Sequence, residues 1–567
     1  MSGPTNFADD RRNAAGLFAQ TMLVIDDEAL QADVEEKPEP AAPMVAPARG
    51  ASRPALPQSP SPPTAIAPVG NRLNAKKLIE RSLDLGIICS VLRIKADDNS
   101  IKRIVRAAEN ADIVSLDWDV ESDGGDLAKK LITKIVRSDI RRNGRLRLIS
   151  IYTSLRSRAS ILRQIQETLR EKLHREFSRT IECVTGESPD GLTRLRIVCL
   201  LKTDGIRPIM PVQKRFEVGE KDLPDRLLVE FSNLSEGLLG NVAMATIASV
   251  RDVTHHVLQV FDRNMDGPYF HHRATIDNPT EAEDYGIDLV LSEIKKAVIR
   301  KSISPFLDKS AIGRSIETKF NGQDKTLTFE TPGNSPNGEV EFTPDQTKVL
   351  IQEGLDWFSE NGHANAIQGF KKKGVGKGIS TLFEADLQKS NAQLARFASQ
   401  SQLSFQPRGH RVRCEDYGPN LTTGTIIRMP KGAGILICLQ AVCDTVRRPK
   451  TSPFIFARLE AVSKVENQPV FVVPVQVAGE IEYQIFALSS SAYSDLLSID
   501  FDAEESSQTV RAKTTQGRAG FHFFGSDGSA YQWLGTSKSK RSMRAVYGIA
   551  QNMSRIGFEE FAPFRAH

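Results

Sequence analysis

Short apolar runs alternate with longer amphipathic stretches over the first 201 residues, and this alternation constrains the fold more than any other feature of the sequence. Five of the runs have the length of a buried strand: 22–25, 86–94, 112–116, 146–152 and 195–201. Strands that are joined by helices pair in parallel, with helices on both faces of the sheet. The sequence therefore predicts an α/β domain built on a five-stranded parallel sheet.

A proline-rich segment interrupts this pattern after the first run. Residues 38–68 contain ten of the 29 prolines and no aromatic residue. Such a composition cannot supply a packed core and favours an extended, disordered chain. We therefore predict a disordered insert over residues 31–72 inside an α/β domain of residues 21–215, preceded by an N-terminal tail of residues 1–20.

Further regions follow the α/β domain. Apolar residues recur at helical spacing over residues 221–302, which predicts an all-helical module. Residues 303–400 combine a polar part, punctuated by Gly and Pro, with a second helical part, and we interpret them as a mixed connector. Over residues 405–567, short β-rich runs separated by turn residues predict a β-rich C-terminal domain that is similar to a small barrel.

One segment of the connector is both basic and rich in glycine. Residues 371–378 read KKKGVGKG. The segment lacks the spacer and the Lys-Ser/Thr ending of a phosphate-binding loop, so we interpret it as a basic turn in contact with solvent. Contact with nucleic acid through its lysines and backbone amides stays an alternative.

The overall charge is close to balance. The chain has 74 Lys and Arg against 70 Asp and Glu, a formal net charge of +4, and we do not expect nucleic acid as a partner. No stretch of about 18 consecutive apolar residues is present, which predicts no membrane span. The six cysteines form no CxxC pair and lie mostly in apolar runs, as free thiols do in a reducing compartment. We therefore expect a cytoplasmic protein.

Polar side chains that suit phosphoryl chemistry stand at the ends of four predicted strands. Asp26 and Asp27 follow the first strand, Asp117 follows the third, Thr153 the fourth and Lys202 the fifth. The carboxyl ends of parallel strands meet at one edge of a sheet, so we expect these side chains to lie together. Three crowded carboxylates favour capture of Mg²⁺. One carboxylate can then attack phosphorus, while the cation and the lysine neutralise charge and the hydroxyl donates a hydrogen bond.

These strand ends resemble the receiver domain of bacterial response regulators. The resemblance rests on the motifs Leu23-Val-Ile-Asp-Asp-Glu28, Asp112-Ile-Val-Ser-Leu-Asp117, Ile149-Ser-Ile-Tyr-Thr-Ser154 and Ile197-Val-Cys-Leu-Leu-Lys202. It covers about the first 210 residues and implies a flavodoxin-like fold. The Trp118-Asp119 step, the Tyr152-Thr153 step and the proline-rich insert are further similar to the divergent response receiver family of bacterial conflict and phage-defence operons.

The resemblance implies a role for each residue of the set. Asp26, Asp27 and Asp117 would hold Mg²⁺, and Asp117 would accept the phosphoryl group. Thr153 would sense the phosphoryl group and Lys202 would pair with it. A histidine kinase or another phosphodonor protein would be the partner of this domain. Apart from the resemblance, we interpret the C-terminal β-rich region as an output or partner-binding module with a protein partner.

Two alternatives stand beside this phosphorelay function. In the first, the receiver-like domain is never phosphorylated and the chain is an adaptor or scaffold. This alternative is favoured by Cys199, which occupies the position where receivers carry an aromatic switch residue. The second is catalysis in the C-terminal domain, which shows no clustered acid or metal-ligand motif. Apart from phosphoryl transfer to itself, we do not expect the protein to be an enzyme.

Overall fold

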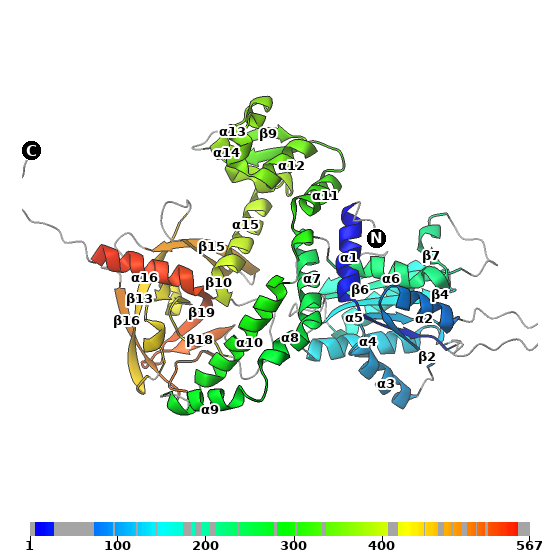
Figure 1. Cartoon of the computed structure of the whole chain (residues 1–567), viewed down its shortest axis with the longest axis horizontal. Coiled ribbons are helices and arrows are strands. Elements are labelled where there is room, and N and C mark those ends of the chain that lie inside the picture. The colour runs from blue at the N-terminus through cyan, green and yellow to red at the C-terminus, as the bar shows by residue number, and fades with distance from the viewer. Residues whose placement is uncertain are drawn as a thin grey trace, which may run out of the picture. The chain divides into compact units, whose positions relative to one another are not determined.

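The computed structural model describes residues 6–27, 73–94, 97–120, 123–142, 145–173, 183–187, 194–203, 211–235, 237–276, 281–300, 303–331, 336–405, 418–446, 448–462, 470–477, 480–488, 496–505, 507–515 and 520–553. The chain divides into two compact units, Met1–Ala248 and Ser249–His567, and each is described by itself (Figure 1). The predicted proline-rich insert, residues 31–72, lies outside the described residues. Within the described ranges, none of the helices combines the length and the hydropathy of a membrane-spanning segment.

A single sheet forms the centre of the N-terminal unit. Five of its strands run parallel, in the order β2 (Ile88–Leu92), β1 (Thr21–Ile25), β3 (Ile113–Leu116), β4 (Leu146–Thr153) and β6 (Arg194–Lys202). This is the strand order of flavodoxin-like folds. The structure therefore confirms the predicted parallel α/β sheet.

The predicted number of strands is wrong, because the sheet has seven strands rather than five. β5 (Cys183–Glu187) runs antiparallel to the first part of β6, and the two-residue strand β7 (Glu217–Val218) pairs in parallel with its end. Both strands satisfy backbone groups along the outer edge of β6. Neither carries an apolar run of strand length, so each depends on pairing with β6 rather than on a pattern of its own.

Helices cover both faces of this sheet. One apolar core joins every second residue of the strands to α3 (Asp98–Ala108), α4 (Asp126–Arg141) and α5 (Arg158–Leu173). The other face is covered by α2 (Ala75–Asp84) and α6 (Leu223–Ser232), which contact β2 and β4, respectively. This two-sided arrangement leaves the carboxyl edge of the sheet as the place where the loops after β1, β3, β4 and β6 meet.

The predicted tail over residues 1–20 is wrong, because α1 (Phe7–Phe18) occupies most of it. A capping box begins this helix and satisfies its first backbone amides. Its apolar residues are buried, and the ring of Phe18 stacks on that of Phe231 in α6, with 5.9 Å between the centroids. The first helix is therefore part of the N-terminal unit.

The helix α6 also belongs to this unit, although its sequence lies in the predicted helical module of residues 221–302. Asp225 of α6 pairs with Arg12 of α1 at 2.5 Å and with Arg81 of α2 at 2.6 Å. These ion pairs lower the pKa of the Asp225 carboxyl despite its partial burial. The start of the predicted module is thus packed on the α/β sheet.

A buried ion pair stands at the amino end of β4. The guanidinium of Arg147, which is fully buried, donates two hydrogen bonds of 2.6 Å to the carboxylate of Asp139 in α4. It donates a third, also of 2.6 Å, to the carbonyl of Ala111. The two opposite charges of this pair satisfy each other through two hydrogen bonds.

The middle of the chain is helical, as predicted. α7 (Leu238–Asp252) spans the division between the units. The C-terminal unit then continues with α8 (Thr254–Val260), α9 (Asp266–Thr275) and α10 (Glu281–Arg300). A hairpin of β8 (Lys325–Phe329) and β9 (Gly338–Phe342) follows, with α11 (Lys309–Phe320), α12 (Pro344–Glu353), α13 (Leu355–Glu360), α14 (Lys372–Gly378) and α15 (Leu387–Gln402). The hairpin and α11 to α14 share an apolar core.

The basic, glycine-rich segment is not the turn that we expected, because most of it forms α14. A Cβ atom on Gly374 would lie 2.5 Å from the ring of Phe329, and one on Gly378 would lie 2.5 Å from the carbonyl oxygen of Thr328. Neither distance is compatible with a side chain. The glycines therefore allow α14 to pack closely on β8, and they need no ligand to explain them.

The C-terminal part of the chain is β-rich, as predicted. Its ten-stranded sheet is antiparallel at every described pairing. The strand path runs through β14 (Val470–Val477), β15 (Glu480–Leu488), β13 (Thr451–Ala461), β12 (Ile435–Cys438), β11 (Thr425–Arg428), β19 (Ala530–Ser537), β18 (Phe521–Phe524) and β17 (Lys513–Thr514), with β10 (Leu403–Phe405) on β19 and β16 (Leu496–Asp502) on β13. The final helix, α16 (Ser539–Met553), adds apolar residues to one of its two cores.

Candidate phosphoacceptor site

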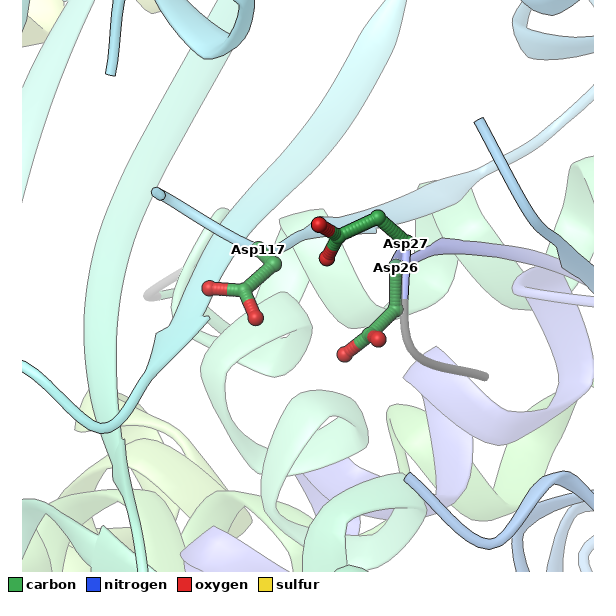
Figure 2. Close-up of side chains that lie close together, drawn as sticks. All are labelled: Asp26, Asp27 and Asp117. Carbon is green, nitrogen blue, oxygen red and sulfur yellow. The ribbon is translucent and has the colours of Figure 1, made fainter. Parts of the chain in front are cut away.

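Three aspartates meet at the carboxyl edge of the parallel sheet. Asp26 and Asp27 follow β1, and Asp117 follows the neighbouring strand β3, where its backbone amide still donates to the carbonyl of Ile25 at 2.9 Å. Carboxylate oxygens of the three lie within 4.8 Å of one another. Figure 2 shows the carboxyl groups gathered between the ends of the two strands. The register of β1 and β3 therefore produces the cluster that the sequence predicts.

Lys202 brings a positive charge into this cluster. It is the last residue of β6, and its ammonium donates to Asp117 Oδ2 at 2.7 Å and to Asp26 Oδ2 at 2.9 Å. The lysine side chain is 8% exposed, so both ion pairs are shielded from solvent. A single ammonium thus bridges the acids that follow two different strands.

Burial and charge act in opposite directions on this pair. Burial raises the pKa of the Asp117 carboxyl, the ammonium of Lys202 counteracts part of the rise, and the nearby carboxylate of Asp26 adds to it, so that the pKa is raised. Burial alone would lower the pKa of Lys202, but attraction to Asp117 and Asp26 raises it above its ordinary value. The ammonium form of Lys202 is therefore strongly favoured.

The donor set of the site suits a hard divalent cation. With all groups ionised, three carboxylates and one ammonium leave two negative charges in a small volume, which a divalent cation would neutralise. The available ligands are carboxylate oxygens, which Mg²⁺ prefers. In the part of the chain that the structure describes, no other group of three His, Cys, Asp or Glu side chains gathers closely enough to hold a metal ion. The residues therefore fit Mg²⁺.

Thr153 lies at the same edge, as the last residue of β4. β4 lies between β3 and β6, the strands that carry Asp117 and Lys202. Its side chain is buried, and its hydroxyl oxygen accepts a hydrogen bond of 3.2 Å from the backbone amide of Leu155. The hydroxyl hydrogen is then available for a second partner.

Tyr152 is a further member of the site that our reading of the sequence missed. Its buried ring lies beneath Lys202, whose ammonium nitrogen is 5.7 Å from the ring centroid. Its hydroxyl donates a hydrogen bond of 2.9 Å to the carbonyl of Val218 in β7. Burial, helped by negative charge from Glu220 and from the aspartates of the site, raises the pKa of the phenol, so the hydroxyl stays a donor. The tyrosine therefore connects the charge cluster to β7.

A second contact holds the segment that enters β7. Arg158, the first residue of α5, donates to the carbonyl of Cys199 at 2.8 Å. Its guanidinium lies over the ring of Phe216, 3.4 Å from the centroid. Cys199 itself is buried in the core that β6 shares with α5, where burial raises its pKa to about 12. The aromatic side chain at the edge of this site therefore comes from β4, and not from position 199 of β6.

The fold and the site define a class of protein. A parallel sheet in this order, with three aspartates and a lysine at its carboxyl edge, is the arrangement of receiver domains in response regulators. Residues 18–193 match the family model of the response receiver domain, and this N-terminal region of the chain is a receiver domain of that kind. The match includes Asp26, Asp27, Asp117 and Thr153 and ends before Lys202.

The receiver domain points to a signalling role like that of response regulators. The family match covers none of the C-terminal unit. Comparisons of the chain with curated proteins and with solved structures gave no match.

Proposed function

We propose that the receiver domain accepts a phosphoryl group on Asp117 from a histidine kinase, and that the chain relays this signal to a C-terminal output or partner-binding module. The observation that carries the proposal is the contact of Lys202 with Asp117 inside a cluster of three aspartates. The likeness to response receivers of bacterial conflict systems supports a role in bacterial defence. In this proposal, phosphoryl transfer to Asp117 is the only reaction of the chain.

The side chains that this protein contributes to the transfer all lie at the carboxyl edge of the sheet. A carboxylate oxygen of Asp117 forms a bond to phosphorus, and the bond from phosphorus to the imidazole nitrogen of the donor breaks. A Mg²⁺ ion held by Asp26, Asp27 and Asp117 would neutralise charge on the phosphoryl oxygens. Lys202 supplies a fixed positive charge, and the hydroxyl of Thr153 supplies a hydrogen-bond donor.

Phosphorylation would change how Lys202 divides its contacts. The ammonium is shared between Asp26 and Asp117, and a phosphoryl group adds about −1.5 to −2 charges beside it. The phosphoryl oxygens would then compete with Asp26 for the ammonium. Because Lys202 lies over the ring of Tyr152, and Tyr152 holds β7, a shift of the lysine would reach the segment that leads into α6.

The second candidate function is an adaptor that is never phosphorylated. The observation that favours it is the contact between Lys202 and Asp26, because the ammonium already donates to two of the three acids and neutralises one of the three negative charges. In that case the receiver fold would only display surfaces for partners. The two functions differ in whether Asp117 reacts.

A phosphate-affinity gel separates the two functions. The full-length protein is incubated with Mg²⁺ and a small acyl phosphate, and compared with Asp117→Asn and with the matched control Asp119→Asn. Asp119 is two residues away and accepts a hydrogen bond from the amide of Gly124 instead of facing Lys202. We expect a slower band for the wild type and for Asp119→Asn, and none for Asp117→Asn. Equal mobility of all three proteins with every phosphodonor, histidine kinases included, would leave the adaptor.

A further inference from the structure

A basic groove runs between α3 and α4 of the receiver domain, which lie side by side (Figure 1). The groove has a volume of about 470 Å³, and five of its eight lining residues are cationic. Lys102 and Arg106 come from α3, one helical turn apart, and Lys134, Arg137 and Arg141 come from one face of α4. Each helix therefore contributes a row of positive charges to the same groove.

Among the residues that the structure describes, these five cations have no role in ion pairs that stabilise the fold. None of the five forms an ion pair with a residue that the structure describes, whereas their neighbours Lys129 and Lys130 pair with Asp126 and Asp98. The single acid of the groove is Glu109, which is already engaged by the guanidinium of Arg142 at 3.0 Å and by the hydroxyl of Ser138 at 2.9 Å. The groove therefore keeps a large excess of positive charge.

Helix stability explains only part of this arrangement. Arg106 and Arg141 lie in the last turns of their helices, where a cation interacts favourably with the helix dipole. Lys102, Lys134 and Arg137 lie further from the helix ends and gain nothing from this effect. Like charges that face one another across a groove repel, so the arrangement costs stability unless an anion binds between the rows.

We propose that this groove binds the sugar-phosphate backbone of a nucleic acid without reading its base sequence. Lys134 and Arg141 are seven residues apart, about 10 Å along the axis of α4, and each strand of a duplex presents about three phosphates over that length of the duplex axis. Two rows of charge suit a series of phosphates better than a single anion. The lining contains no aromatic side chain on which a base could stack.

The net charge of the chain concealed this feature. A formal net charge of +4 does not indicate nucleic acid as a partner, and the alternative of contact with nucleic acid concerned only residues 371–378. The groove concentrates five cations and one acid in a single place, and the compensating acids lie elsewhere. The inference does not depend on phosphorylation of Asp117, because the groove lies between two helices and contains no residue of the candidate phosphoacceptor site.

Binding of the full-length protein to short fluorescent duplexes of DNA and RNA, of mixed sequence, tests the proposal by anisotropy. The groove variant carries Lys102→Glu and Arg137→Glu, both exposed and one on each helix. The matched control carries Arg163→Glu and Lys172→Glu, which make the same charge change at exposed positions of α5. A second groove variant, Lys102→Gln with Arg137→Gln, removes the charges without adding negative ones.

We expect the wild type and the control to bind a duplex with affinity that falls steeply as salt is raised. We expect both groove variants to lose about tenfold or more in affinity at low salt, with a salt slope that is smaller by about 2. Circular dichroism of all variants checks that the fold is retained. Loss of the same size in the control would show that only the total charge matters, and would overturn the proposal.

Two further results would also overturn it. One is the absence of binding by the wild type at low salt. The other is displacement of the labelled duplex by a different polyanion. Inorganic tripolyphosphate or polyglutamate would then compete as effectively as unlabelled duplex does at the same concentration of charge. The first competitor would identify a small oligophosphate ligand, and the second would identify a general preference for polyanions.

Discussion

The two ends of β4 hold two buried charge clusters of different construction. At the amino end, Arg147 and Asp139 form a closed pair, in which one cation satisfies one anion through two hydrogen bonds. At the carboxyl end lies an open cluster, in which Lys202 donates to two of the three neighbouring aspartates, Asp26, Asp27 and Asp117, so the charges do not balance. A balanced buried pair serves the fold, because every charge has its partner within the protein. An unbalanced cluster at a sheet edge keeps a net charge that a cation or a phosphoryl group can alter.

Breaking the closed pair should have the largest effect on stability. Asp139→Ala leaves the guanidinium of Arg147 buried without its acid, which should lower the free energy of unfolding by about 3–5 kcal/mol. Urea denaturation followed by circular dichroism measures the loss. The double variant Asp139→Leu with Arg147→Met should recover most of it, because two apolar side chains can fill the same space. No recovery in the double variant would mean that the pair also specifies local structure.

Removing the ammonium from the open cluster should lower the free energy of unfolding by a smaller amount. Binding of Mg²⁺ should restore part of this loss. Lys202→Met leaves Asp26 and Asp117 without their ammonium, and we expect a loss of about 1–3 kcal/mol. Mg²⁺ at ten times its dissociation constant for the variant should then stabilise the variant by about 1.4 kcal/mol, and the same concentration of Mg²⁺ should stabilise the wild type by less. Thermal unfolding with and without Mg²⁺ measures both changes. If Mg²⁺ stabilised Asp139→Ala as much as it stabilises Lys202→Met, the ion would bind at a place other than the open cluster.

Alkaline pH should lower the stability that the open cluster contributes, because Lys202 loses its proton there, and should leave the pair of Arg147 and Asp139 unchanged. The pKa of Lys202 is raised above its ordinary value of 10.5, so the stability that its charge contributes is complete below pH 10.5 and is lost as the pH rises through the raised pKa. The guanidinium of Arg147 does not titrate in this range. In an alkaline pH series of unfolding curves, the wild type should lose more stability than Lys202→Met. Parallel curves for the two proteins would contradict the shifted pKa.

The smallest expected effect concerns the link from the open cluster to β7. Tyr152→Phe removes the hydrogen bond to the carbonyl of Val218 and should lower stability by about 1 kcal/mol. The amides of residues 214–222 should exchange faster with deuterium, while exchange around Arg147 should stay unchanged. In the wild type, phosphorylation should alter exchange in the same segment. An unaltered rate there in Tyr152→Phe would mean that the contact with Arg158 holds β7 alone.

The parallel sheet and its edge were accessible from the sequence because both depend on local signals. Each central strand is a short apolar run, and each site residue that we predicted directly follows or ends one of these runs. The strands β5 and β7 gave no such signal, because they exist through pairing with the edge of β6. Helix α1 was missed because its few apolar residues gain their meaning from α6, more than 200 residues away.

The same reason explains what was missed in the site. Tyr152 stands next to Thr153 in the sequence, but its role depends on β7, which the sequence did not reveal. The sequence directed attention to position 199 instead, where the side chain faces the core. The basic groove depends on the packing of α3 against α4, and a net charge cannot show how charges are distributed. The usable signal was the Tyr152-Thr153 step at a strand end, which we interpreted only as part of the family resemblance and not as a site residue beside a hydroxyl.

The central claim is that the open cluster exists to make Asp117 react. An acyl phosphate on an aspartate can be reduced by labelled borohydride, which leaves a permanent mark on the residue that carried it. After incubation with Mg²⁺ and a phosphodonor, we predict that peptide mapping by mass spectrometry finds this mark on Asp117. A mark on Asp26, Asp27 or Asp119 instead, or no mark with any donor, would contradict the account.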